Sequence, residues 1–231
     1  MEEPLWPPGT FLGRLRSATR ERLLSVGVRR SVKEAQVLLR EGALESHVIL
    51  LDDALVKVTV ALSDGRHALL AIRVSGDIVG EISALNGTPR TATVTACRPS
   101  VIRIIHQNTF RAVLRDNPEA ALEVAGIVAD RLRWANRRRT DFTSYPVRVR
   151  LARVLWEIAV AYGRRGPRGV VIDIRLTQDE LATLCGAAEI SLQKALGGLR
   201  ADGIVATGYR EIVIRDSDAL RSIAGLLKDV S

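Results

Sequence analysis

The chain has 231 residues, of which 47% are hydrophobic, and a formal net charge of +8. This length exceeds what one average domain needs, so we expect two modest domains. The excess of 34 Lys and Arg over 26 Asp and Glu favours a polyanionic partner such as DNA, RNA or anionic lipid. Charge alone does not choose among these partners.

The N-terminus and the cysteines indicate the compartment. The opening MEEPLWPPGT is acidic and proline-rich, unlike a secretory signal, and no stretch approaches the roughly 20 apolar residues of a membrane span. Cys97 and Cys185 are far apart and have no CxxC partner, which argues against disulfides and thiolate metal sites. His47, His67 and His106 occur singly. We therefore expect a cytoplasmic protein with no metal site and no membrane partner.

The first half of the chain has the hydrophobic period of β-strands. Short apolar runs alternate with turn residues, and Asp64-Gly65 suits a tight hairpin because glycine tolerates positive φ. The expected strands are Gln36–Leu39, His47–Leu51, Leu55–Leu62, Ala68–Val74, Thr91–Ala96 and Val101–Ile105. Many short strands with frequent turns predict a sandwich or barrel.

The period changes near Asn117-Pro118, where proline suits the first turn of a helix that can continue to about Asp141. A narrow seam recurs at spacings of three and four along it: Leu122, Ala125, Ala129, Leu132 and Asn136. Such a seam favours a self-associating helix, and ordinary packing on a core is the alternative. An arginine run near the end reads most simply as a solvated face: Arg131, Arg133, Arg137, Arg138 and Arg139.

A second helix is expected over Pro146–Tyr162, and Gly163–Gly169 then reads as a mobile turn whose arginines can touch a phosphate backbone. A third helix should begin after Thr177, because Thr177-Gln178-Asp179-Glu180 has the form of a capping box. Gly186 allows a sharp turn before a fourth helix. This spacing is that of a helix-turn-helix, with an ordinary helical hairpin as the alternative.

Two short β-runs, Ile204–Ala206 and Glu211–Ile214, complete a winged-helix layout. The helix from about Ala188 to Ala201 would then be the recognition helix. In a major groove Gln suits adenine, Lys suits guanine or phosphate, and Glu accepts from cytosine N4. The candidate DNA contacts are Thr177, Gln178, Glu189, Ile190, Ser191, Gln193 and Lys194.

The segment Gly76–Val94 can cradle an anion. Backbone N–H groups at a short helix start near Gly80 would receive a phosphate, Arg90 would neutralise it and Thr91 would add a hydroxyl. Glu81 would repel the same phosphate if it pointed inward, so it either accepts from a sugar hydroxyl or pairs with Arg90. A purely structural salt bridge between Glu81 and Arg90 is the alternative.

These segments resemble a known family. GDIVGEISALNGTPRTATV is similar to the phosphate-binding cassette of cyclic-nucleotide-binding domains, and LTQDELATLCGAAEISLQKALGGL completes the arrangement of CRP/FNR-type bacterial transcription regulators. The resemblance implies an α+β fold with a jelly-roll-like β-sandwich sensor domain (residues 1–117), a long dimerisation helix and hinge (118–144) and a C-terminal winged helix-turn-helix domain (145–231).

The resemblance also implies a function and a site. The function is that of a homodimeric regulator that binds double-stranded DNA and RNA polymerase and senses a small-molecule effector, cAMP or another cyclic nucleotide. Glu81 is expected on the ribose 2′-hydroxyl, while Ala135 and Asn136 stand where cAMP-binding members hold the base with Thr-Ser. Asn136 can bond a purine edge, whereas Ala135 cannot. The implied ligand-binding residues are Gly80, Glu81, Ile82, Arg90, Thr91, Ala135 and Asn136.

The recognition helix departs from the family pattern. Ala188-Glu-Ile-Ser-Leu192 stands where Ser-Arg-Glu-Thr-Val is common. Ala188 lacks a capping side chain, a loss of about 1 kcal/mol, and Glu189 brings negative charge close to DNA. The alternative hypothesis is therefore a nucleotide-sensing protein that acts through protein partners, with weak or lost specific DNA binding. An enzyme is not expected, because no P-loop, metal-ligand cluster or Ser/His/Asp order is visible.

Overall fold

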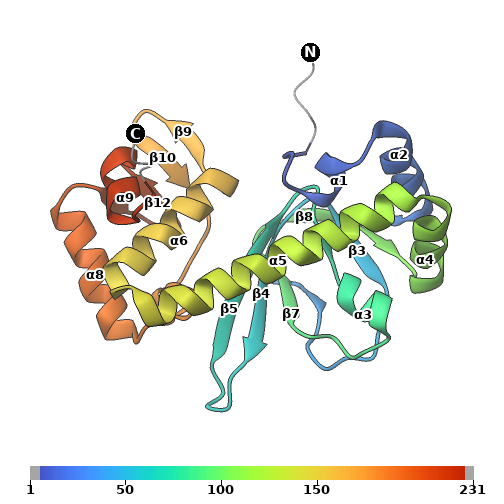
Figure 1. The fold of residues 1–231 in the computed structure, drawn as a ribbon, viewed down its shortest axis with the longest axis horizontal. Coiled ribbons are helices and arrows are strands. Elements are labelled where there is room, and N and C mark those ends of the chain that lie inside the picture. Colours follow the sequence, from blue (N-terminus) through green and yellow to red (C-terminus); the bar gives the residue numbers. More distant parts are fainter. Residues whose placement is uncertain (1–5, 227–231) are drawn as a thin grey trace. The chain divides into compact units, whose positions relative to one another are not determined.

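The structure is a computed structural model that describes residues 6–226. The chain divides into two compact units between Trp134 and Ala135 (Figure 1). Helix α5 (Pro118–Ser144) contributes its first part to one unit and its last part to the other. Within the described range, no helix is both long and apolar enough to cross a membrane.

The first unit is a sandwich of two four-stranded sheets, all of whose pairings are antiparallel (Figure 1). One sheet has the order β1 (Val28–Val32), β8 (Ser100–Ile105), β3 (Val48–Asp53) and β6 (Ile78–Val79). The other has the order β2 (Val37–Leu39), β7 (Thr93–Ala96), β4 (Leu55–Ala61) and β5 (His67–Val74).

Strand β3 separates two hydrophobic cores, because successive side chains of a strand point to opposite faces. Ile49 and Leu51 pack in the core between the two sheets, whereas Val48 and Leu50 belong to a second core. Helices cover that second core: α1 (Phe11–Arg14), α2 (Ser17–Val26), α3 (Glu81–Asn86), α4 (Gln107–Asp116) and the first part of α5.

The α+β class and the six expected strands are confirmed, with ends shifted by one or two residues. The hairpin at Asp64-Gly65 is also confirmed, since β4 pairs with β5 across it. The pattern missed β1, whose sequence VRRSV exposes its first four residues and so shows no apolar alternation. It also missed β6 and helices α1, α2 and α4.

The second unit packs helices around a small sheet. The helices that follow α5 are α6 (Val147–Tyr162), α7 (Gln178–Cys185), α8 (Glu189–Ala201) and α9 (Ser217–Ile223). The sheet has the order β11 (Val205–Thr207), β12 (Ile212–Ile214), β10 (Gly169–Ile172) and β9 (Arg164–Gly166). Helix α6 buries Leu151, Leu155 and Ile158 at helical spacing, as expected for a core helix. The winged layout is confirmed.

The expectation of a mobile turn after α6 is wrong. Strands β9 and β10 pair there as a hairpin, and β10 continues the sheet onto β12. Arg164 is paired with Asp173 at 2.7 Å and Arg168 with Glu211 at 2.9 Å, so two of the three arginines have carboxylate partners.

Helix α5 has a buried side and an exposed side. The buried side chains are Ala120, Val124 and Ile127 in the first unit and Arg138 and Asp141 in the second. All the seam residues are exposed: Leu122, Ala125, Ala129, Leu132 and Asn136. The arginine run is therefore not a solvated face throughout, because Arg138 is a buried side chain.

The turn between α7 and α8 depends on Gly186. This residue ends α7 in the left-handed region with φ of 57°. A Cβ added there would lie 2.6 Å from Cδ1 of Phe142 at the end of α5. Both the backbone conformation and the close approach of the ring therefore require glycine.

We predict that Gly186→Ala lowers the free energy of unfolding by about 2 kcal/mol, because the left-handed backbone and the contact with Phe142 both oppose a Cβ. Gly197→Ala is the matched control. It lies inside α8, where an added Cβ meets no atom within 4 Å, and it should raise stability by about 0.5–1 kcal/mol. Urea unfolding followed by circular dichroism measures both changes. Equal effects at the two positions would contradict this account of the turn.

Candidate functional site

The first site lies at the turn between β6 and α3. Gly80 precedes α3 in the left-handed conformation, with φ of 83°. A Cβ at Gly80 would lie 2.5 Å from Nη1 of Arg90. The glycine therefore lets the arginine reach the main chain of the turn.

Arg90 is a cation buried without a carboxylate partner. It is 3% exposed, and its guanidinium donates to the carbonyl of Gly80 at 2.9 Å and to that of His47 at 2.5 Å. Within residues 6–226 its Nε has no hydrogen-bond partner and it forms no ion pair. Burial lowers the pKa of Arg90, and the negative charges of Glu45 and Glu81 oppose this only in part. Such a group favours a nearby anion.

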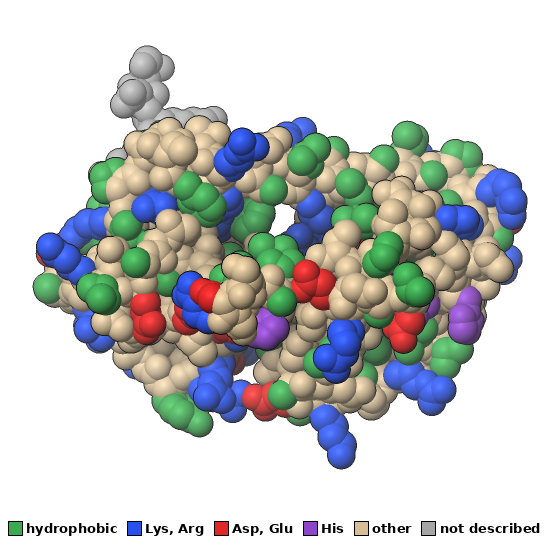
Figure 2. All heavy atoms as spheres, turned by 90° about the horizontal axis from the view of Figure 1, so that it is seen from below, with side chains coloured by type: hydrophobic (Ala, Val, Ile, Leu, Met, Phe, Trp, Pro, Cys, Tyr) green, Lys and Arg blue, Asp and Glu red, His purple; other side chains and the backbone are tan. Residues whose placement is uncertain are grey.

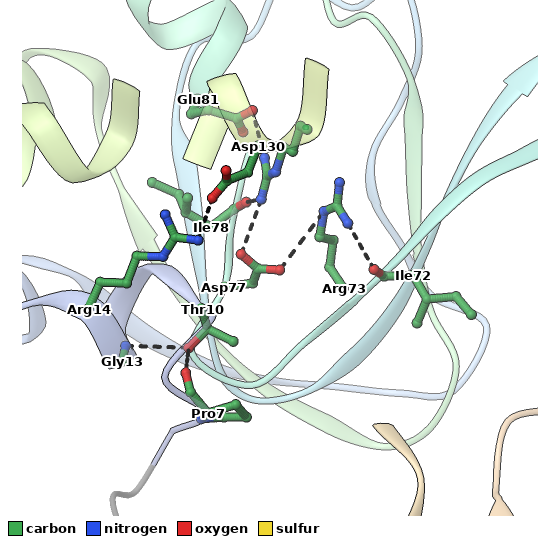
Figure 3. Close-up of polar contacts among 11 residues, drawn as sticks. Pro7, Thr10, Gly13, Arg14, Ile72, Arg73, Asp77, Ile78, Glu81 and Asp130 are labelled. Atoms are coloured by element: carbon green, nitrogen blue, oxygen red, sulfur yellow. Dashed lines mark hydrogen bonds and ion pairs between the residues drawn. The ribbon is translucent and has the colours of Figure 1, made fainter. Parts of the chain in front are cut away.

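Glu81, by contrast, is paired with an arginine of α5 through one of its carboxylate oxygens (Figure 3). Glu81 is 3% exposed, and its carboxylate accepts from Arg131 at 2.7 Å. The same guanidinium donates to Asp77 at 3.2 Å and to the carbonyl of Ile78 at 2.7 Å. Burial would lower the pKa of Arg131, but the carboxylates of Glu81 and Asp77 outweigh it and raise the pKa.

The next residue of α5 makes a second anchor. Asp130 accepts from Arg14 of α1 at 2.5 Å (Figure 3). This hydrogen bond holds the pKa of Asp130 below its ordinary value, with help from Arg133 and against the opposing effect of burial. Adjacent residues of α5 thus bind two different elements of the first unit, α1 and the turn that carries Glu81.

The alternative of a structural salt bridge between Glu81 and Arg90 is wrong, because Glu81 pairs with Arg131. Sequence reasoning missed Arg131. A signal for it was present, because Arg131 follows the buried Val124 and Ile127 at spacings of seven and four, on the core side of the helix.

The structure brings Gly80, Glu81 and Arg90 together at one turn. Ile82 and Thr91 lie beside them in the chain and are exposed. Ala135 and Asn136 are exposed on α5 and belong to the second unit.

The second site is the pair of helices α7 and α8. The capping box is confirmed, since Thr177 Oγ1 accepts from the Glu180 N–H at 3.1 Å and the Glu180 carboxylate accepts from the Thr177 N–H at 2.8 Å. The hydroxyl of Thr177 is thereby committed to the helix start, while Gln178 next to it is exposed.

Two arginines bind the carboxyl end of α7. Arg138 of α5 donates to the Leu184 carbonyl at 2.8 Å, and Arg150 of α6 donates to the carbonyls of Cys185 and Gly186 at 2.9 and 2.8 Å. Cations suit the free carbonyls and negative dipole end of a helix. The end of α5 is therefore built into the helix-turn-helix.

Helix α8 buries one side and exposes the other. Ala188 precedes it without a side-chain cap, as predicted. The buried side chains are Leu192, Ala195, Leu196 and Leu199, and the exposed ones at the start are Glu189, Ile190, Ser191, Gln193 and Lys194. Gln193 Nε2 donates to Glu189 Oε1 at 3.3 Å. Every residue of α8 proposed to contact DNA is thus accessible.

Basic side chains do not form a single patch on the face drawn in Figure 2. Lys and Arg side chains are spread over it, with Asp and Glu among them. In the wing, Tyr209 between β11 and β12 is 89% exposed.

Two known families match the segments of the chain that contain these sites. The family described as "Cyclic nucleotide-binding domain" matches residues 29–117, and the family described as "Crp-like helix-turn-helix domain" matches residues 149–223. The first match contains the turn with Gly80, Glu81 and Arg90, and the second contains α7, α8 and the wing.

Individual relatives have the same domain order. The chain is 28% identical over 180 residues to the CRP-like cAMP-activated global transcriptional regulator of Mycobacterium tuberculosis, covering 78% of this chain and 80% of that protein. A CRP-family transcriptional regulator from Thermus thermophilus matches with a TM-score of 0.71 and 25% identity, over 85% of this chain and 96% of the other.

The c-di-GMP responsive global regulator CLP of Xanthomonas campestris matches in fold, with a TM-score of 0.73 and 20% identity over 87% of this chain and all of the other. The two family matches, the curated relatives and the shared architecture lead to one conclusion: the chain belongs to the CRP/FNR family of ligand-responsive transcription regulators.

Proposed function

We propose that this chain is a homodimeric regulator that binds a cyclic nucleotide, cAMP or a close relative, and double-stranded DNA. The observation that carries the effector proposal is Arg90, a buried cation without a carboxylate, next to the left-handed Gly80. A cyclic phosphate would supply the missing anion through charge-assisted hydrogen bonds. The similarity to a cAMP-activated regulator favours cAMP as the first nucleotide to test.

The other candidate residues have complementary roles in this proposal. Thr91 would add a hydroxyl to the phosphate, and Ile82 would border the ligand. Glu81 would accept from the ribose 2′-hydroxyl with the oxygen that Arg131 leaves free. Asn136 would bond the purine edge, next to Ala135, which has no polar group to offer.

In this proposal, three consecutive segments of the chain have separate functions. Residues 1–117 would sense the effector, residues 118–144 would form the dimerisation helix and hinge, and residues 145–231 would bind DNA. As a DNA-binding regulator the protein would act in the cytoplasm and contact RNA polymerase. The exposed seam of α5 would be the dimer interface, because Leu122 and Leu132 are 73% and 61% exposed in the single chain.

A second candidate function is supported by Ala188 and Glu189. The recognition helix lacks a side-chain cap and begins with an acidic residue, which favours action through protein partners instead of specific DNA binding. A footprint on duplex DNA that weakens as salt rises supports the regulator. Effector-dependent binding to a protein with no DNA protected would select the alternative.

We predict that Arg90→Gln weakens cAMP binding at least about 30-fold, because two charge-assisted hydrogen bonds to the phosphate are lost. Calorimetric titration with cAMP, cGMP and c-di-GMP measures this effect. Arg98→Gln is the control, since Arg98 pairs with Asp53 on the surface at 2.6 Å. Unchanged nucleotide binding by a folded Arg90→Gln variant would place the pocket elsewhere.

Arg131→Met should lower the free energy of unfolding by about 3 kcal/mol, because the buried carboxylate of Glu81 loses its cation. Arg133→Met, two residues away, is the control. Its partner Asp130 is partly exposed, so the expected change is below about 0.5 kcal/mol. Adding Glu81→Gln to Arg131→Met should recover part of the loss in denaturant unfolding. A double variant no more stable than Arg131→Met would argue against this pairing.

For the dimer, we expect Leu132→Glu to raise the dissociation constant at least about 100-fold, since the interface would bury a carboxylate. Analytical ultracentrifugation should show the wild type at twice the 25.2 kDa chain mass and this variant at the chain mass. Arg137→Glu, exposed on α5 and outside the seam, should remain dimeric. A Leu132→Glu variant that stays dimeric would remove the seam as the interface.

A further inference from the structure

Ile190 has no role in the fold of the second unit. Its side chain is 80% exposed, whereas Leu192 and Leu199 of the same helix are buried. A β-branched residue also has no advantage over leucine or alanine in a helix. The side chain stands in the first turn of α8, the part of a recognition helix that meets base edges.

An aliphatic side chain can recognise only one feature in the major groove, the C5-methyl group of thymine. The polar edges of guanine, adenine and cytosine would each lose hydrogen bonds to water against it. The chemistry of Ile190 therefore selects a thymine.

Glu189 restricts the neighbouring base in a different way. A carboxylate only accepts hydrogen bonds, so it matches the amino groups of cytosine and adenine and repels the acceptors O6 and N7 of guanine. The bond from Gln193 at 3.3 Å holds the carboxylate over the exposed side of the helix. The same bond turns the amide nitrogen of Gln193 towards Glu189 and leaves its second N–H and its carbonyl for a base.

We propose that the start of α8 reads a half-site through Ile190 on a thymine methyl group and Glu189 on the amino group of cytosine, and that it rejects guanine at the Glu189 position. This inference rests on the proposed function as a DNA-binding regulator. It makes Ile190 and Glu189 two specificity-determining residues of this chain.

In the experiment, the full-length chain selects the duplexes that it binds from a randomised pool. The selection is done at low salt, with cAMP, cGMP and c-di-GMP in turn. Each thymine of the enriched half-site is then replaced singly by uracil, which removes only the methyl group, and affinity is measured by fluorescence anisotropy. One replacement should weaken binding roughly three- to fivefold, as expected for one buried methyl group. In Ile190→Ala the same replacement should change affinity less than twofold.

Val160→Ala is the matched control for Ile190→Ala, because Val160 is a 69% exposed β-branched residue on α6 of the same unit. This variant should keep the full difference between thymine and uracil. For Glu189, guanine in place of the selected cytosine should weaken wild-type binding at least about tenfold. Glu189→Gln, which can also donate, should reduce that penalty to below about threefold.

The outcomes separate the two proposals. Enrichment of a site in which every uracil replacement is neutral, or in which Glu189→Gln leaves the discrimination against guanine unchanged, overturns the inference while the regulator stands. No enriched site and no salt-dependent DNA binding with any nucleotide overturns the proposed function itself. Loss of a protein partner from Ile190→Ala, with no DNA bound by the wild type, would make this surface a protein-docking site and also overturn the inference.

Discussion

Helix α5 has a buried side and an exposed side, and the residues of both sides recur with the same helical period of 3.6 residues per turn. Ala120, Val124 and Ile127 occupy the side that closes the helical core of the first unit. Arg131 is the next residue on that side, so its bond to Glu81 depends on the core being packed. The orientation of the Glu81 carboxylate is therefore tied to the packing of this helix.

Two arginines near that turn are in opposite electrostatic situations. Arg131 has two carboxylates within hydrogen-bond distance, and their charge raises its pKa in spite of burial. Arg90 has only main-chain carbonyls, and burial lowers its pKa. Arg131 stabilises the fold because carboxylates of the same chain neutralise its charge. Arg90 is a candidate for ligand binding because no carboxylate neutralises its charge.

Local features were predictable from the sequence, and pairings over long distances were not. The capping box at Thr177 and the left-handed Gly186 depend on a few adjacent residues, so spacing alone indicated both. The bond between Glu81 and Arg131 joins residues 50 positions apart. Helical spacing places Arg131 on the core side of α5, but it does not say which carboxylate the guanidinium meets. Strand β1 and the β9–β10 hairpin were missed because exposed arginines interrupt the apolar alternation on which strand prediction relies.

If the proposed effector binds at Arg90, its binding would also change the stability of the protein. A buried cation that has main-chain carbonyls but no carboxylate as partners makes the ligand-free fold less stable than it would be with an anion in place. A ligand that binds only the folded chain adds about 2.7 kcal/mol of stability at one hundred times its dissociation constant. Proteases act on the unfolded fraction, which is larger without the ligand. The effector would then set how much regulator survives in the cell as well as what the regulator does.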